Sequence, residues 1–395
     1  MKWTNKGHQF DALGNNFKKR NKILIYGACE IGKFIFEELC KYGLENSIDG
    51  FIDRNFNLLN GIYCDKKVYS PDIIFNKFNE KHTIIVAVTE RSKAKIFDRL
   101  KRAGYIYSLD FFSYEDFILN LNNIYVPVFA MYTQNRLLIS SACVIPSTVC
   151  NLRCKHCLNF TPYITNFETR ELKSVCNDMD ILFKWVDYTN RFQISGGEPL
   201  LYPKFNQLAQ YIGEKYRNKI DIFETVLNGT IIPSDTSCEI MKQYNMTVYL
   251  DNYTDSIPEK LNKRIEIIQQ LEKYNIQWID NSVDEWFDLD IFNTDNTCMS
   301  DTELTEYFDT CNNPWHCYEN GRMYGCNFDR FATKAGLNKE TENSYFDLNK
   351  MNEGQKKEFL EFTLNYNNNG YVELCKHCAG WAEMNKNKVP VAIQC

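Results

Sequence analysis

The sequence has no apolar run approaching the roughly 18 residues that a membrane-spanning helix requires, so we expect no membrane partner. Its first residues lack the apolar core of a signal peptide, which favours a cytoplasmic protein. It also lacks an excess of basic residues, because the net charge is −6. A general nucleic-acid binder needs a basic face, so we expect no nucleic-acid partner.

Cysteine, by contrast, is abundant. The 395 residues include 16 cysteines, in a chain whose 44% hydrophobic and 24% charged content is ordinary for a folded protein of two or three domains. In an intracellular chain, cysteines at this density act more often as metal ligands than as disulfides. Two groups stand out along the sequence: Cys150, Cys154 and Cys157, and then Cys311, Cys317, Cys326, Cys375, Cys378 and Cys395. The others are scattered, and we interpret them as small buried hydrophobic residues.

The first group has the spacing C-x3-C-x2-C within one short loop. Three thiolates in such a loop can hold three irons of a four-iron cluster and leave the fourth iron open, whereas most clusters have four protein ligands. The alternative is a structural zinc site, which needs four ligands. His156 could be the fourth, but it lies between Cys154 and Cys157, where the loop could hardly wrap one small ion.

A second motif, Ser195-Gly196-Gly197-Glu198-Pro199, follows about 40 residues later. Together the two motifs resemble the signatures of radical S-adenosylmethionine (SAM) enzymes. The resemblance implies that a 4Fe-4S cluster binds SAM at its open iron, and that Gly196, Gly197 and Glu198 receive the methionine amino group. It also implies that His156, which precedes the third cysteine, lies near the adenine.

Residues 20–115 are predicted to form a Rossmann-like domain, a doubly wound parallel sheet. Apolar strands at 23–28, 48–53 and 83–88 alternate with helical patterns, as in α/β folds. The loop from Gly27 to Gly32 keeps the outer glycines of a nucleotide-binding turn, but Cys29 replaces the middle one, and Asp53 is at a plausible ribose-binding position. A docking domain with a degenerate crevice is the alternative.

We interpret residues 116–140 as a linker and residues 141–300 as a further run of alternating strands and helices, with candidate site residues at the strand ends. The resemblance implies a partial (β/α)6 barrel for this region. Asn228 and Asp251 are candidate partners of the SAM ribose or carboxylate, or else ordinary caps of the following segments. Tyr253, Trp278 and Asp280 are pocket-lining candidates on the same argument.

Residues 301–395 contain the pattern C-x9-G-x4-C, a gap, and C-x2-C, formed by Cys311, Gly321 and Cys326 and then by Cys375 and Cys378. Asn320-Gly321 predicts a hairpin turn. The pattern resembles the twitch part of the SPASM extension of radical SAM enzymes, and it implies one auxiliary 4Fe-4S cluster held by those four cysteines. A structural zinc ribbon is the alternative. The roles of Cys317 and Cys395 stay open.

Taken together, the resemblance implies hydrogen abstraction from a sugar, sugar alcohol or nucleotide-linked sugar, giving oxidation or epimerisation in surface-polysaccharide or carbohydrate biosynthesis. The implied cofactors are two 4Fe-4S clusters and SAM, with an electron donor such as flavodoxin or ferredoxin. In an epimerase, Cys317 would be the thiol that returns a hydrogen. The alternatives are modification of a ribosomally made peptide and a non-catalytic metal-binding regulator.

Overall fold

The computed structural model describes residues 1–75, 81–118, 124–311 and 315–395. The chain forms two compact units, one of residues 8–139 and one in which residues 1–7 join residues 140–395. Two backbone N–H groups of residues 1–7 hold this segment in the second unit. That of Trp3 donates to the Asn367 carbonyl at 2.9 Å, and that of Gly7 donates to Glu361 Oε2 at 2.7 Å. Each unit is described by itself.

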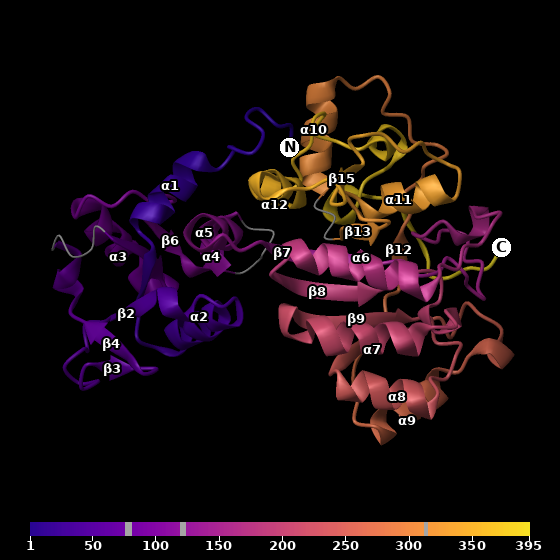
Figure 1. Ribbon diagram of the computed structural model, residues 1–395, viewed down its shortest axis with the longest axis horizontal. Coiled ribbons are helices and arrows are strands. Elements are labelled where there is room, and N and C mark those ends of the chain that lie inside the picture. Colours follow the sequence, from indigo (N-terminus) through magenta and orange to yellow (C-terminus); the bar gives the residue numbers. More distant parts are fainter. Residues whose placement is uncertain (76–80, 119–123, 312–314) are drawn as a thin grey trace. The chain divides into compact units, whose positions relative to one another are not determined.

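The unit of residues 8–139 is built on a six-stranded sheet with the order β3-β4-β2-β1-β5-β6 (Figure 1). Strand β1 is parallel to β2 and β5, and β5 is parallel to β6, so the Rossmann-like prediction is confirmed. Ile23, Leu24 and Ile25 are fully buried, as expected where helices cover both faces of a parallel sheet. The elements are α1 Asp11–Lys19, β1 Lys22–Tyr26, α2 Glu30–Lys41, β2 Ile48–Ile52, β3 Ile62–Tyr63, β4 Lys66–Tyr69, β5 His82–Val86, α3 Glu90–Arg102, β6 Phe111–Ser113, α4 Tyr114–Ile118 and α5 Tyr125–Gln134.

Much of the segment predicted as a linker, residues 116–140, is instead a helix. Helix α5 is almost wholly buried and packs on α1, where the rings of Phe17 and Phe129 lie 5.2 Å apart. Pro127 is tolerated because it stands in the first turn, where no backbone N–H partner is lost. The segment therefore belongs to the N-terminal core, apart from residues 119–123, which lie outside the described residues.

The other unit is organised around an eight-stranded sheet with the order β11-β10-β9-β8-β7-β13-β14-β15. The pairs β8–β9, β9–β10 and β10–β11 are parallel, and helices α6 and α7 lie along the sheet in Figure 1. The elements through residue 300 are β7 Leu138–Val144, α6 Leu172–Trp185, β8 Tyr188–Ile194, α7 Phe205–Tyr216, β9 Ile220–Leu227, α8 Asp235–Gln243, β10 Met246–Asp251, α9 Arg264–Lys273, β11 Gln277–Asn281 and β12 Glu285–Phe287.

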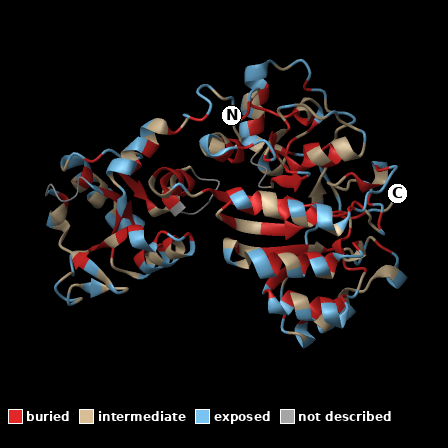
Figure 2. Cartoon of the chain, in the orientation of Figure 1, coloured by how far each residue is buried: buried red, intermediate tan, exposed pale blue. Residues whose placement is uncertain are grey.

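The covering helices follow from the spacing of apolar residues. In α7, Phe205, Leu208, Ala209 and Ile212 are buried, which is the i, i+3, i+4, i+7 pattern of one helical face. Figure 2 shows the consequence, because strand β8 is largely buried and the outward faces of α7 and α8 are exposed. Such helices on parallel strands give the open, partial barrel that the sequence predicted.

The region beyond residue 300 completes this sheet, so the predicted domain boundary does not separate two sheets. Strand β13 is parallel to β7 and pairs Cys317 with Cys143, which makes it the sixth strand of the barrel. Asn320 and Gly321 both have positive φ, 54° and 72°, so the predicted hairpin turn is confirmed. The elements are α10 Asp301–Cys311, β13 Cys317–Glu319, β14 Arg322–Tyr324, α11 Asn327–Lys334, β15 Tyr345–Asp347, α12 Lys356–Thr363 and β16 Lys388–Pro390.

Candidate active site

The predicted site residues lie at the carboxyl ends of the barrel strands. The loop of Cys150, Cys154 and Cys157 follows β7, and the Gly196-Gly197-Glu198 segment follows β8. Asn228 comes directly after β9, and Asp251 ends β10. Because the strands are parallel, their ends meet at one edge, which is the catalytic face of barrel folds.

The cysteine loop and the glycine segment are joined through their backbones. The N–H of Gly197 donates to the Ser147 carbonyl at 3.2 Å, and the N–H of Glu198 donates to the Val149 carbonyl at 2.8 Å. A Cβ at Gly197 would lie 2.2 Å from the Val149 oxygen, and one at Gly196 would lie 2.2 Å from the Ser147 oxygen. The two glycines are therefore needed for the close approach of the two motifs.

The three thiols have polar neighbours of their own. Cys150 Sγ lies 3.5 Å from the N–H of Leu152 and 3.8 Å from Asn228 Nδ2, and the Cys157 thiol lies 3.5 Å from Thr161 Oγ1. Burial raises the pKa of Cys150 to about 11 and that of Cys154 to about 12, so both are neutral thiols until a metal replaces the proton. Backbone and amide N–H groups near sulfur suit an iron–sulfur cluster, whose properties depend on such hydrogen bonds.

Glu198 is only 2% exposed, and its carboxylate is held in place from two sides. Oε1 accepts from the N–H of Leu200 at 3.1 Å, and Oε2 accepts from the N–H of Asn228 at 2.9 Å. Burial raises its pKa to about 7, because desolvation penalises the charged form. A carboxylate has about four lone-pair sites, so this one still has acceptor capacity for an ammonium group.

Asn228 and Asp251 are both bonded to protein groups at the same edge. Asn228 Nδ2 donates to Asn151 Oδ1 at 3.0 Å, which links β9 to the cysteine loop. Asp251 accepts from Asn281 Nδ2 at 2.6 Å and from the Tyr253 hydroxyl at 2.5 Å. Burial raises the pKa of Asp251 to about 6. No motif in the sequence indicated Asn151 or Asn281, because their contacts depend on pairing between distant segments.

One cavity brings most of the predicted residues together. Its lining includes Cys150, Cys154, Cys157, Gly196, Gly197, Glu198, Asn228, Asp251, Tyr253 and Trp286. His156 is absent from the lining of this cavity. Trp278 and Asp280, predicted with lower support, are also absent from it. Three thiols, two carboxyl groups and two glycines therefore line one cavity.

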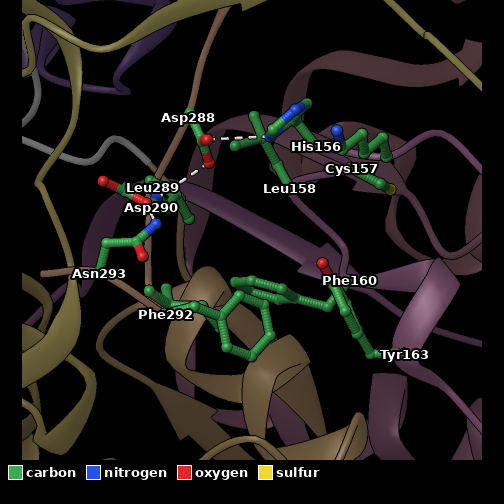
Figure 3. Close-up of a pocket in the computed structure, with 12 residues that line it drawn as sticks. His156, Cys157, Leu158, Phe160, Tyr163, Asp288, Leu289, Asp290, Phe292 and Asn293 are labelled. Atoms are coloured by element: carbon green, nitrogen blue, oxygen red, sulfur yellow. Dashed lines mark hydrogen bonds and ion pairs between the residues drawn. The ribbon is translucent and has the colours of Figure 1, made fainter.

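His156 lines a second cavity of about 290 Å³, which shares Cys157 with the first (Figure 3). Its Nδ1 lies 2.9 Å from Asp288 Oδ2. On the far side, Tyr163 and Phe292 face each other with ring centroids 5.1 Å apart. The His156 ring is thus directed to the segment after β12.

A second set of thiols is gathered in the core of the C-terminal region. Cys326, Cys375 and Cys378 belong to one hydrophobic cluster, each less than 9% exposed. The pKa of Cys375 is raised well above its usual value, first by burial and then by the charges of Cys326, Cys378 and Cys311. Asn296 Nδ2 donates to the carbonyls of Cys375 and Cys378, at 2.9 and 3.1 Å, and so fixes the C-x2-C loop.

Cys317 is apart from both cavities. It is 0% exposed on β13, and its thiol contacts that of Cys143 on β7. Burial raises its pKa well above the usual value. Cys395 is exposed. Among the residues that the structure describes, no three Cys, His, Asp or Glu side chains converge closely enough to hold a single metal ion.

In the N-terminal unit, the glycine loop lies between β1 and β5, where the strand order reverses and ligands bind in such folds. Asp53, predicted to face a ribose, accepts instead from the N–H of Ala28 at 3.1 Å and from that of Asn55 at 2.7 Å. The Cys29 thiol donates to the Ala87 carbonyl at 3.3 Å. These side chains thus hold the crevice loops together.

Similarity to known proteins is found among solved structures. No curated protein matches the chain. Among solved structures, the chain is similar to anSMEcpe with bound AdoMet, with 19% identity over 35% of this chain and 42% of that chain and a TM-score of 0.29. It is similar to BtrN in complex with AdoMet and 2-DOIA, with 13% identity over 64% and 98% of the two chains and a TM-score of 0.40. Streptococcus suis SuiB bound to S-adenosylmethionine shows 18% identity over 48% and 41%, with a TM-score of 0.28.

The chain therefore spans less than half the length of the anSMEcpe and SuiB chains. Among the described residues, no helix is long and apolar enough to cross a membrane. A family model, described as the Radical SAM superfamily, matches residues 144–308, which contain the cysteine loop and the glycine segment. This family implies a 4Fe-4S cluster and SAM, and the thiols, glycines and carboxylate around the first cavity fit both. Residues 144–308 are therefore a radical SAM domain.

Proposed function

We propose that this protein is a cytoplasmic radical SAM oxidoreductase that removes hydrogen from a carbohydrate-like substrate. The observation that carries the proposal is the single cavity in which Cys150, Cys154 and Cys157 face Glu198. The three thiolates would hold the core 4Fe-4S cluster. With SAM bound, the cluster would supply a 5′-deoxyadenosyl radical that takes a hydrogen atom from an unactivated C–H bond.

The chain's own residues would bind and orient SAM. Glu198 offers a desolvated carboxylate to the methionine ammonium, and Gly196 and Gly197 keep the backbone close to the cysteine loop. Asn228 and Asp251, already positioned by their neighbours, would contact the ribose or carboxylate. The His156 ring is paired with Asp288, so we propose that the backbone near His156 adjoins the adenine.

A polar barrel interior supports a polar substrate. Arg191 on β8 donates to Glu224 on β9 through Nε at 3.0 Å and through an Nη at 2.9 Å, and Gln193 Nε2 donates to Glu224 at 3.0 Å. Val226, which shares a strand face with Glu224, lines the SAM cavity. The Arg191 guanidinium lies between the rings of Tyr249 and Trp315.

These groups are suited to a molecule with several hydroxyl groups. The Glu224 side chain is 0% exposed, whereas that of Arg191 is 33% exposed although it points into the barrel. The barrel is therefore accessible to solvent beside a charged hydrogen-bonding pair. Sugars, sugar alcohols and nucleotide-linked sugars can use such donors and acceptors, and this supports them as the substrate class.

We further propose a second 4Fe-4S cluster held by Cys311, Cys326, Cys375 and Cys378. Loss of a hydrogen atom from a carbinol carbon would leave a substrate radical. The hydroxyl proton would leave to solvent and one electron would pass to the second cluster, which balances the oxidation of an alcohol to a ketone. A flavodoxin or ferredoxin would supply the reducing electron to the core cluster.

Burial of Cys317 favours oxidation over epimerisation. An epimerase thiol must reach the substrate carbon to return a hydrogen, but Cys317 has no exposed surface and contacts Cys143. Epimerisation through Cys317 is the second candidate, because β13 forms part of the barrel wall. In deuterated water, an epimerase would place deuterium on the product carbon, whereas a dehydrogenase would give a ketone without it.

The experiment that tests the function is anaerobic turnover of the reconstituted, reduced protein with SAM and a panel of polyols, nucleotide-linked sugars and peptides. We expect 5′-deoxyadenosine formation, with deuterium transferred to it from a C-deuterated carbohydrate. Glu224→Gln should raise KM for the carbohydrate and leave substrate-free SAM cleavage unchanged. Glu266→Gln, on the exposed face of α9, is the matched control. Deuterium transfer from a peptide alone would contradict the substrate class.

A further inference from the structure

The segment of residues 391–395 lies antiparallel to the cysteine loop. The N–H of Lys155 donates to the Ile393 carbonyl at 2.7 Å, and the N–H of Cys395 donates to the Arg153 carbonyl at 2.9 Å. Cys154 and Gln394 are thus paired as in an antiparallel β-bridge. The central cysteine of the radical SAM motif receives a strand partner from a segment 240 residues away.

The Gln394 side chain makes three hydrogen bonds with this loop and its own segment. Its Oε1 accepts from the N–H of Arg153 at 2.9 Å. Its Nε2 donates to the Ala392 carbonyl at 2.6 Å and to Cys154 Sγ at 3.2 Å. The amide orientation is therefore fixed by an acceptor on one side and a backbone donor on the other, and one N–H is directed at the sulfur.

The segment that carries Gln394 is itself anchored. Val391 and Ala392 are buried in a cluster with Leu152, Cys154 and Ile257. The preceding strand β16 pairs with β12, opposite Trp286. The Gln394 amide therefore has little freedom to rotate away from Cys154 Sγ.

We propose that Gln394 is a positioning residue for the core cluster, which sets its reduction potential through an N–H···S hydrogen bond to the Cys154 thiolate. Hydrogen bonds to cluster sulfurs are one of the factors that set cluster potentials. The N–H dipole stabilises the more negative, reduced state more than the oxidised state, so its removal makes reduction harder. The proposal rests on the core cluster of the proposed function.

The test is the midpoint potential of the core cluster in the full-length, iron-loaded protein, measured by EPR-monitored titration. The core signal is identified as the one that changes when SAM is added. We expect Gln394→Leu to shift the potential to a more negative value with iron content unchanged. Gln394→Glu keeps an acceptor for Arg153 and puts a negative charge beside the sulfur, so its shift should be larger. Ile393→Ala, which removes an exposed side chain and keeps the carbonyl, should leave the potential unchanged.

An unchanged potential in both loaded Gln394 variants would overturn the proposal and leave the segment as an anchor only. Loss of iron from both variants, with the Ile393→Ala protein fully loaded, would also overturn it, because the side chain would then be needed for assembly. Failure of the proposed function gives a different result, since the parent protein would then lack the SAM-sensitive EPR signal.

Discussion

The two groups of cysteines in this chain differ in what surrounds them. Cys150, Cys154 and Cys157 line an open cavity together with a carboxylate and a glycine segment. Cys326, Cys375 and Cys378 lie instead among apolar side chains of the C-terminal core. A site that must exchange a cofactor needs access and polar groups, whereas a site that only stores an electron is served by burial. The surroundings thus distinguish the two groups of cysteines more clearly than their spacing does.

Loss of the first group of cysteines should have the largest effect on SAM cleavage and iron content. We expect the triple variant with Cys150, Cys154 and Cys157 changed to alanine to lose all SAM cleavage and about half of its iron, because the second site is separate. Iron analysis and 5′-deoxyadenosine assays measure this. Cys176→Ala, on α6, is the control and should retain both properties. Complete loss of iron from the triple variant would show that the two sites are one.

Loss of a thiol from the second group should uncouple SAM cleavage from substrate oxidation. Cys375→Ala should retain the SAM-sensitive EPR signal and 5′-deoxyadenosine formation while ketone formation falls to background, since the electron has no acceptor. The exposed Cys298 provides a matched control, Cys298→Ala, in which ketone formation should persist. A normal ketone yield in Cys375→Ala would show that the second group of cysteines does not accept the substrate electron.

A substitution of Glu198 removes the carboxylate that the first group of cysteines has beside it. Glu198→Gln should weaken SAM binding by about 1.5–3 kcal/mol, the range for a hydrogen bond to a charged group. Equilibrium dialysis with the iron-loaded protein measures this. Glu214→Gln, on the exposed face of α7, is the control. Equal affinity in the Glu198 variant and the parent would exclude Glu198 as the ammonium partner.

The same variant should change the pH dependence of stability. Burial raises the pKa of Glu198 from 4.5 to about 7, so between these pH values the folded, ligand-free protein holds a proton that the unfolded chain has released. The free energy of unfolding therefore falls as pH rises through this window. Glu198→Gln has no titrating group at this position, so it should remove the fall in unfolding free energy between pH 4.5 and about 7, measured by urea unfolding at several pH values. An unchanged pH profile would contradict the raised pKa.

Cys317→Ala should have the smallest effect on turnover. Because the thiol is buried against Cys143, we expect a loss of about 1 kcal/mol in unfolding free energy and normal ketone formation. Thermal denaturation and product analysis in deuterated water measure the two. A product that carries solvent deuterium in the parent protein, and is lost in the variant, would instead assign epimerisation to Cys317.

Local patterns predicted much of this fold. Apolar strands followed by amphipathic helices identified the Rossmann-like sheet and β8 to β11, and the Asn320-Gly321 pair identified the hairpin. Pairing between distant segments left no local signal. The sequence therefore did not reveal that β13 is a barrel strand beside β7. Helix α5 was predicted as a linker because its short apolar run is flanked by polar residues.

The candidate site divides in the same way. The spacing of the cysteines and the Gly196-Gly197-Glu198 motif predicted residues that the fold brings into one cavity. Partners supplied by other segments were not predictable: Asn281, which donates to Asp251, and Gln394, which donates to Cys154, have no motif around them. The direction of the His156 ring depends on Asp288, which is also distant in sequence.

The parallel pairing of β13 with β7 has a consequence for how the protein folds. During synthesis, β7 emerges long before β13, so one edge of the barrel sheet lacks its partner until most of the chain has been made. Pairings between such distant segments form slowly, and an open strand edge is a site for association with other chains. The core cysteine loop follows β7 directly, and its antiparallel partner around Gln394 is made later still. The cysteine loop therefore acquires its antiparallel partner only after β13, the partner of β7, has been made.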